Sequence, residues 1–562
     1  MTGSEGRKTG NRAGVPKHDE WRPSDHADRS GGLQGRVARG LTWTLLDTWG
    51  SQVLGLVVFV LLARLLTQAD FGLVAFAAIF VSFAQLLVDQ GLGDAVVQRP
   101  TLTRRQLDTA FWASLAAGVL ITIGGVVLAI PIAIVLGEPQ LEPIIQVLSV
   151  TFMLTALSSI QTGLLRREMA FGSLAIRRIL AVIVGGAVGV GMAFAGFGAW
   201  SLVGQQIAAA AISVVTLWAV TPWRPSRAFS AQDFRELFAF GIRVVGGDVL
   251  NFISRNTDNL LVGVFLGVVP LGIYAVGYRI LDTSQTLLVS AARKLIFPIF
   301  SRMQHDRERI RRAYTRMNRA SSALTLPGYI GLALVAQEAT VVFFGDKWAE
   351  AGPVAAVLFL IGPALTISAF SGALFNAVGH PEVTLRLRLV TTVTNVIGFV
   401  IAVVIFRDIV AVAAAYVIRG YLLLPLNLYW MRQYGGIPIR DHIVELKGVA
   451  AATAVMAGIV LLVKLALLDH ASPALLLAIE VLVGALAFVV ALLVFERSLV
   501  VELVTVAGQA VPGGARVGRL LRLPMAPAGG KKARTAREPD IPASLDTEPD
   551  IDPAGLTDEH ED

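Results

Sequence analysis

The segment FISRNTDNLLVGVFLG, residues 252–267, is apolar enough to enter a membrane, yet it carries Arg255 and Asp258. Side chains three residues apart share one face of a helix, so these two charges are expected to pair. Arg279 and Asp282 repeat the same residue types at the same spacing. A charge at the centre of a bilayer costs about 2.5–3.5 kcal/mol on insertion scales, so both pairs should face protein or water.

Further ionisable residues lie in or beside apolar runs, and together they predict a binding site for an anion. Arginine presents a planar fork of donors that fits phosphate, and a cavity lined with arginines concentrates anions. The candidates for holding an anionic headgroup are Arg255, Arg279, Arg243, Arg177 and Arg178. Their candidate charge partners, or ion-coupling groups, are Asp258, Asp282, Asp248, Asp47 and Asp89.

Structural roles for these charges stay open. The two Arg–Asp pairs could simply neutralise each other inside a helical bundle, because buried pairs are poor indicators of any one role. Arg177, Arg178 and Arg243 could extend to the membrane surface as anchors. Asp47 and Asp94 could be helix caps or turn residues.

The composition defines the class of protein that must position these residues. Of 562 residues, 54% are hydrophobic and only 16% are charged, and the mean hydropathy is +0.65. Apolar runs of about twenty residues, enough to cross a roughly 30 Å hydrocarbon layer, recur from about Leu41 to about Phe495. These runs are continuous rather than alternating, which favours a polytopic helical membrane protein over a β-barrel. The chain has no cysteine and its histidines are scattered, so we expect no metal site and no cofactor.

Fourteen membrane spans are predicted. They begin near Leu41, Leu73, Phe111, Ile144, Leu174, Trp200, Leu237, Leu271, Ala320, Val354, Leu385, Ile409, Val449 and Ala474. Arginine is concentrated in alternate loops, and the other loops offer only Arg64, Lys347, Arg407 and Lys464. By the positive-inside rule both termini are cytoplasmic. The net charge of +7 therefore reflects membrane topology and does not indicate nucleic-acid binding.

The sequence contains an internal repeat. LTQADFGLVA at 66–75 aligns with LGVVPLGIYA at 266–275, so that Gly72 corresponds to Gly272 at an offset of two hundred residues. Six spans separate the two copies, and both therefore enter the membrane in the same direction. This is a parallel repeat about an axis along the membrane normal, as in transporters that rock two lobes around a central cavity.

The predicted organisation follows from this repeat and from composition. It consists of a disordered cytoplasmic tail (1–39), a first six-helix lobe (40–232), a second six-helix lobe (233–445), two C-terminal helices (446–498) and a second disordered cytoplasmic tail (505–562). The last two spans have almost no ionisable residue in their interiors. We therefore expect the two lobes, and not the final pair, to line a wet path.

Several motifs resemble one known family. They are DQGLGDAVVQRPTLTRRQLDTAFW (89–112), LLRREMAF (164–171), GFGAWSLVGQQ (196–206), FPIFSRMQHD (297–306), FGDKW (344–348) and FNAVGHPE (375–382). In order and spacing they resemble the Wzx-type polysaccharide flippases of the multidrug/oligosaccharidyl-lipid/polysaccharide exporter superfamily, over nearly all of residues 35–500. The long tails at both ends depart from that family's compact form.

The resemblance implies a non-enzymatic transporter in the cytoplasmic membrane. It would move undecaprenyl-pyrophosphate-linked oligosaccharide from the cytoplasmic to the outer leaflet, through two lobes that rock around a cationic cavity. The implied partners are this lipid-linked substrate, membrane lipids, a coupling ion (H⁺ or Na⁺) and polysaccharide-assembly proteins. The family supplies no universal motif for the site, so the site residues rest on charge alone.

Three other functions remain as alternatives. A drug/cation antiporter of the same superfamily needs acids in its cavity, whereas the second lobe mixes Arg with Asp. A lipid II flippase uses the same physics with a different headgroup. A membrane glycosyltransferase or polymerase needs catalytic groups on a sizeable external loop, and no paired carboxylates are placed for such acid–base work.

Overall fold

The computed structural model describes residues 46–89, 96, 102–301, 303, 306–467 and 470–502. The predicted tails, 1–39 and 505–562, lie outside these ranges. A first compact unit ends at Arg497, and all that follows concerns this unit. Within the described residues it is entirely helical except for short connections.

The helices follow one another through short turns. In chain order they are η1 (Leu46–Gly50), α2 (Ser51–Leu65), α3 (Gln68–Asp89), α5 (Arg104–Leu136), α6 (Leu141–Arg167), α7 (Phe171–Phe194), α8 (Trp200–Val220), α9 (Ala231–Leu266), α10 (Val268–Ser301), α11 (Arg307–Phe344), η2 (Asp346–Trp348), α12 (Ala351–Phe359), α13 (Gly362–Ser368), α14 (Ser371–Ala377), α15 (Pro381–Ile401), η3 (Ala402–Phe406), α16 (Ile409–Gly435), α17 (Ile439–Leu467) and α18 (Pro473–Phe495).

Twelve stretches in the described ranges are long and apolar enough to cross a membrane, so the chain is a multi-pass helical membrane protein. One of them, Ala351–Ala377, is broken into α12, α13 and α14, with Pro363 near the start of α13. The long, charged helices α9 and α10 are not among the twelve. The predicted number of fourteen spans therefore stays a prediction.

Local sequence explains where individual helices begin and end. Thr103 and Gln106 form a reciprocal capping box at the start of α5. Asp408 and Ser472 accept hydrogen bonds from backbone N–H groups at the starts of α16 and α18. Gly137 ends α5 with a φ of 70°, a left-handed conformation that glycine adopts without strain.

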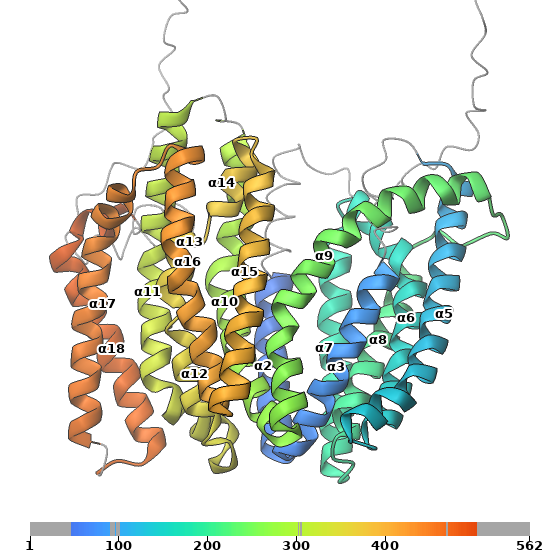
Figure 1. Cartoon of the computed structure of the whole chain (residues 1–562), viewed down its shortest axis with the longest axis horizontal. Helices are drawn as coiled ribbons and strands as arrows, with labels where there is room; N and C mark the ends of the chain where they lie inside the picture. Colours follow the sequence, from blue (N-terminus) through green and yellow to red (C-terminus); the bar gives the residue numbers. More distant parts are fainter. Residues whose placement is uncertain are drawn as a thin grey trace, which may run out of the picture. The chain divides into compact units, whose positions relative to one another are not determined.

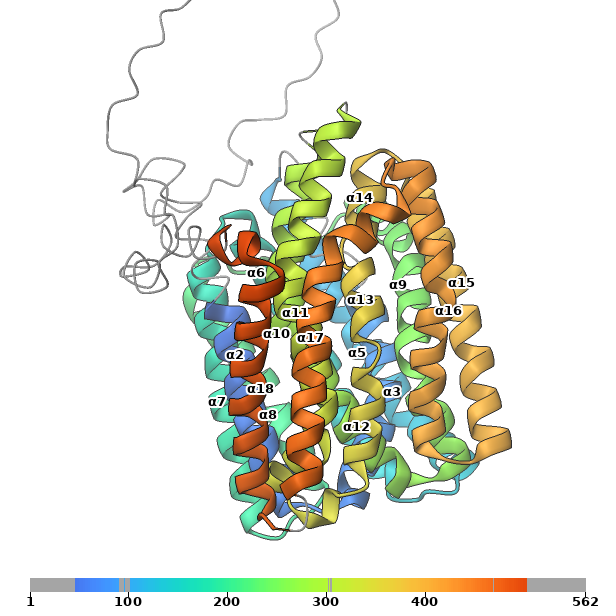
Figure 2. The same ribbon diagram turned by 90° about the vertical axis from the view of Figure 1, so that its left-hand side faces the viewer.

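The helices gather into two bundles (Figure 1). α2, α3 and α5 to α8 pack together as the first bundle, and α10 to α16 form the second bundle. α17 and α18 pack against α11 at the edge of the second bundle, where both views place them side by side (Figures 1 and 2). α9 contacts α3 and α5 as well as α15, so it runs between the bundles.

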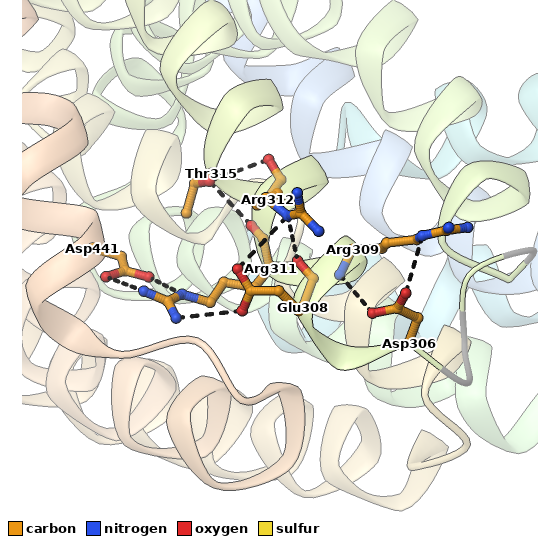
Figure 3. A network of polar contacts seen from close by, with 7 residues as sticks. All are labelled: Asp306, Glu308, Arg309, Arg311, Arg312, Thr315 and Asp441. Atoms are coloured by element: carbon orange, nitrogen blue, oxygen red, sulfur yellow. Dashed lines mark hydrogen bonds and ion pairs between the residues drawn. The ribbon is translucent and has the colours of Figure 1, made fainter.

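The turns divide between two ends of the unit. The short connections 66–67, 267 and 407–408, together with η2, lie at one end, called here the outer end (bottom of Figure 1). At the opposite end, called here the inner end, a polar network surrounds the start of α11 (Figure 3). There Asp306 caps α11, and Arg311 Nε donates to Asp441 of α17 across 2.6 Å.

Candidate functional site

The charges of α9 and α10 pair between helices. Arg255 Nη2 of α9 lies 2.9 Å from Asp282 Oδ1 of α10. In the described part of the chain Arg255 makes no ion pair with Asp258, and Arg279 makes none with Asp282. The prediction of pairs three residues apart was therefore wrong. Arg255 pairs with Asp282 on the neighbouring helix instead of with Asp258 on its own helix.

Asp258 has a packing role. Its side chain is 2% exposed, and its carboxylate accepts a hydrogen bond of 2.9 Å from the hydroxyl of Tyr274 on α10. Tyr274 is itself fully buried. The carboxylate therefore fixes α9 against α10 instead of facing open space.

Removing this carboxylate should destabilise the fold. Asp258→Ala leaves the buried Tyr274 hydroxyl without its acceptor, at a cost of about 1–3 kcal/mol. Asp258→Asn keeps an oxygen acceptor and should lose less. Thermal unfolding of the purified protein in detergent measures the difference. An Asp258→Ala protein that unfolds at the wild-type temperature would contradict this role.

A polar cavity of about 510 Å³, called here the second-bundle cavity, opens between α9, α10, α15 and α16. Its lining residues are Ser254, Arg255, Tyr278, Asp282, Gln285, Thr286, Thr391, Asn395, Tyr416 and Arg419. Guanidinium groups bind phosphate oxygens, and hydroxyl and amide groups bind sugar hydroxyls. This cavity therefore offers donors and acceptors for an anionic, sugar-bearing molecule.

Arg419 is a residue of this cavity that sequence reasoning missed. Its guanidinium carbon lies 4.7 Å from the centre of the Tyr416 ring, and its Nε is buried. That Nε makes no hydrogen bond to any described residue. The signal was present, because Arg419 is a charge in the middle of an apolar run, and such charges mark functional sites by default.

Arg279 and Arg178 line a different cavity. This first-bundle cavity, about 560 Å³, lies among α2, α3, α7, α8 and one face of α10. The Arg279 guanidinium carbon is 6.0 Å from the centre of the Phe59 ring on α2. Gln52, Gln205 and Gln206 add polar groups to the lining. Three of the predicted cationic residues are thus divided between these two cavities of the described part: Arg255 lines one, and Arg178 and Arg279 line the other.

The other predicted site residues either line neither cavity or have side chains that the structure does not describe. Arg177 precedes Arg178 on α7 but lines neither cavity. Residues whose side chains lie outside the described part are Arg243 and Asp248 on α9, Asp47 on η1 and Asp89 at the end of α3. Asp94 lies outside the described residues altogether. Their predicted roles stay predictions.

The repeated turns meet at the outer end. A Cβ on Gly72 would lie 1.8 Å from the carbonyl oxygen of Val268, and one on Gly272 would lie 2.1 Å from that of Gln68. The contact is reciprocal, because residues 68 and 72 face residues 268 and 272. Reciprocity of this kind is a property of two-fold-related surfaces. Glycine is required at both positions because the backbones approach so closely.

A second set of contacts, called here the outer clasp, joins α2 to the end of α11 and to η2. Arg64 donates to the carbonyl oxygens of Val342 and Phe343, the latter across 2.8 Å. In return, Lys347 Nζ donates to the Arg64 and Leu66 carbonyl oxygens, and Trp348 Nε1 donates to the Ala63 carbonyl oxygen. Partial burial lowers the pKa of Lys347, and the nearby Asp70 carboxylate opposes this shift. The two bundles are therefore tied together at the outer end.

The fold and these cavities define a class of protein: a helical membrane transporter with polar cavities between its helices. Two solved structures of membrane transporters share this fold. The lipid II flippase MurJ in an inward closed conformation superposes with a TM-score of 0.66, at 14% identity, over 81% of this chain and 99% of that one. An inward-facing MATE family transporter of the MOP superfamily gives 0.56, at 15% identity, over 68% of this chain and 94% of that one.

The sequence comparisons are more specific. Residues 61–353 match the model of the family described as polysaccharide biosynthesis protein. The succinoglycan biosynthesis transport protein ExoT of Rhizobium meliloti is 31% identical over 59% of this chain and 67% of its own length. The lipopolysaccharide biosynthesis protein WzxC of Escherichia coli is 24% identical over 64% and 74%. The chain therefore belongs to the polysaccharide biosynthesis protein family, with its Wzx-like flippases, as the sequence resemblance implied. It is a membrane transporter of polysaccharide biosynthesis and not an enzyme.

Proposed function

We propose that the protein is a flippase that moves undecaprenyl-pyrophosphate-linked oligosaccharide repeat units across the cytoplasmic membrane by alternating access, for export of a cell-surface polysaccharide. The observation that carries this proposal is the second-bundle cavity, in which Arg255 and Arg419 lie beside Tyr278, Tyr416 and Asn395. The cavity combines groups suited to a diphosphate with groups suited to a sugar.

The charges of the cavity support an anionic substrate. Asp282 offsets Arg255, with which it forms an ion pair, while Arg419 makes no ion pair with any described residue. The lining therefore carries a net positive charge that a diphosphate would neutralise. A substrate containing phosphates gains most from such a site because surrounding apolar helices strengthen electrostatic interactions.

The architecture proposed with this function has fourteen membrane helices: two six-helix lobes related by a parallel two-fold repeat and two additional helices. The reciprocal contact of residues 68 and 72 with 268 and 272 supports the repeat. α9 and α10 then correspond to α2 and α3. Their lower hydropathy is consistent with helices that line a cavity instead of facing lipid. Both termini are cytoplasmic in this topology, and the inner end faces the cytoplasm.

The outer clasp supports alternating access. It holds the two bundles together on the side away from the cytoplasm, which is the arrangement expected of a transporter loading from the inside. Release of the headgroup to the outer leaflet requires these contacts to break. The clasp consists mainly of hydrogen bonds from the charged Arg64 and Lys347 side chains to carbonyl oxygens, each worth about 1.5–3 kcal/mol net. These non-covalent contacts can break and re-form during a transport cycle.

Lipid II flipping and drug or cation export are the competing functions. The fold is shared with MurJ and with MATE transporters, so the fold alone does not separate them. An exporter of cations would be disfavoured by a cavity in which Arg255 and Arg419 face the substrate.

Deletion of the gene in its own host tests the proposal. We expect surface polysaccharide to be lost and the lipid-linked repeat unit to accumulate with its sugars facing the cytoplasm. Expression of the wild-type chain should restore both. Accumulation of lipid II instead would favour the alternative, and unchanged surface polysaccharide with no stranded lipid would overturn the proposal.

A further inference from the structure

Three ionisable side chains that line neither polar cavity meet where α11, α17 and α18 pack together (Figure 2). Lys464 Nζ of α17 lies 2.9 Å from Glu338 Oε2 of α11 and donates across 2.8 Å to the Leu334 carbonyl oxygen. Glu480 of α18 is 1% exposed, and its charged neighbours are Glu338 and Lys464. We call these three residues the α18 cluster. Lys464 and Glu480 are thus among the few ionisable residues of the final two helices, and neither lines a polar cavity described above.

Glu480 lacks the partners that a buried carboxylate requires. Both of its carboxyl oxygens are buried, and neither makes a hydrogen bond within the described part of the chain. With Glu338, Glu480 and Lys464 all ionised, the cluster has a charge of −1. One proton on Glu480 brings the cluster to neutrality, and this removes the cost of an uncompensated charge in an apolar bundle.

The chemistry of the cluster selects a proton over a metal cation. The Lys464 ammonium already occupies the position beside Glu338 that a cation would take, and it would repel a sodium ion. No described group other than the two carboxylates and Lys464 is charged around Glu480 on the helices packed against it. A metal ion would therefore have to lie beside the Lys464 ammonium, whereas a proton needs only one carboxylate oxygen.

The cluster lies toward the outer end. Glu480 is seven residues from Pro473, the first residue of α18, which is a distance of about 10 Å along a helix. Lys464 is three residues from the end of α17, and Glu338 is six residues from the end of α11. A proton arriving from the outer aqueous phase thus has only a short distance to travel.

The same part of α11 takes part in the outer clasp. Val342, one helical turn beyond Glu338, accepts a hydrogen bond from Arg64, and so does Phe343. Toward the inner end, Arg311 pairs with Asp441 and Arg319 pairs with Glu496, which ties α11 to α17 and to the residue after α18 (Figure 3 shows the first pair). A change of charge in the cluster therefore acts on the last two turns of α11, next to the contacts that close the outer end.

We infer that the α18 cluster is a proton-binding site, in which a proton taken from the outer side by the Glu480 carboxylate stabilises the closed outer clasp. In the step, one proton leaves a hydronium ion and forms an O–H bond on Glu480, and the cluster changes from −1 to neutral. Deprotonation leaves a buried negative charge, which favours a conformation that lets water reach Glu480. If the protein is the proposed flippase, H⁺ is its coupling ion. The proton site itself is argued from the α18 cluster and does not depend on which molecule is transported.

The test measures the outer end directly and requires no substrate. The chain has no cysteine, so Phe197→Cys and Phe406→Cys, both exposed near outer turns of the first and second bundles, provide unique sites for spin labels. Double electron–electron resonance in lipid nanodiscs then reports the label separation across a pH series. We expect the separation in the otherwise wild-type chain to shift from shorter at low pH to longer at high pH.

Variants assign the shift to one residue. Glu480→Gln, which is neutral at every pH, should keep the short separation throughout, and Glu480→Asp, which keeps a carboxyl, should retain a pH-dependent shift. Glu350→Gln replaces an exposed acid near the outer end and is the matched control, expected to behave as wild type. A Glu480→Gln protein that keeps the full pH-dependent shift would overturn the inference.

A transport assay separates failure of this inference from failure of the proposed function. In proteoliposomes, an inward proton gradient should accelerate translocation of lipid-linked oligosaccharide by wild type severalfold. Glu480→Gln should lose this acceleration and should translocate more slowly than wild type at every pH, because its outer clasp stays closed. Equal acceleration in both proteins would reject the proton site while leaving the flippase function intact. Absence of translocation by wild type would reject the function and leave the distance measurement valid.

Discussion

Arg419→Ala is expected to lower the rate of headgroup translocation by roughly a hundredfold while the protein still inserts and folds. The guanidinium supplies charge-assisted hydrogen bonds in the second-bundle cavity, and losing about 3 kcal/mol of such binding corresponds to that factor. Arg255→Ala should have a similar effect and should also leave Asp282 without its partner. The measurement is translocation of a lipid-linked oligosaccharide in proteoliposomes, normalised to the amount of folded protein.

A matched control lies on the same helix. Arg432 is exposed near the inner end of α16 and lines neither polar cavity, so Arg432→Ala should transport at the wild-type rate. Arg419→Lys keeps the charge but loses the planar fork, and it should recover only part of the activity. Full activity in Arg419→Ala and Arg255→Ala proteins would remove the chemical basis of the proposed site.

Gly72→Ala is expected to abolish the closed outer end, although it adds only one methyl group. The new Cβ would lie 1.8 Å from the Val268 carbonyl oxygen, and a backbone atom cannot move aside as a flexible side chain can. In a helix interior alanine is otherwise favoured over glycine by about 0.5–1 kcal/mol, so any loss must come from this contact. We expect transport to fall more than tenfold and the outer ends to separate, measured by spin-label distances between positions 197 and 406.

Substitutions of two other glycines serve as the reciprocal test and the control for this experiment. Gly272→Ala, the reciprocal substitution, should produce the same separation, because its Cβ would lie 2.1 Å from the Gln68 carbonyl oxygen. Gly191→Ala on α7 has open space around the new methyl group and should behave as wild type or slightly more stable. Wild-type transport and distances in the Gly72→Ala protein would show that the bundles do not meet here during the cycle.

Much of the fold could be predicted because membrane helices leave strong local signals. Apolar runs and arginine-rich alternate loops placed most helices within a few residues, such as the helix expected near Leu174 that begins at Phe171. The repeat at 66–75 and 266–275 identified the two turns that contact each other in the structure. Family membership was recoverable because several motifs keep their order and spacing.

The pairing of charges could not be predicted because it depends on neighbouring helices. Spacing along α9 favoured Arg255 with Asp258, but Asp282 on α10 lies closer, and Asp258 binds Tyr274 instead. The division of the arginines between two cavities has the same cause. Arg279 projects from the face of α10 that meets the first bundle, and its sequence neighbours do not reveal this.

Two residues were overlooked for a different reason. Arg419 and Glu480 each stand alone in an apolar run, whereas the two Arg–Asp motifs on which the predicted site rested are pairs three residues apart. A solitary charge in a membrane helix needs a partner from elsewhere, a ligand or a proton, and it is therefore the more informative case. Applying that rule to every span would have identified both residues from the sequence.

The central claim is that this chain carries a lipid-linked oligosaccharide across a bilayer, and reconstitution tests it most directly. Purified protein is placed in liposomes containing a polyprenyl-diphosphate oligosaccharide, and an impermeant lectin or glycosidase reports the sugar exposed on the outer leaflet. The account predicts that exposed sugar rises with time in protein-containing liposomes and that Arg419→Ala largely prevents the rise. Equal exposure in protein-containing and empty liposomes would contradict it.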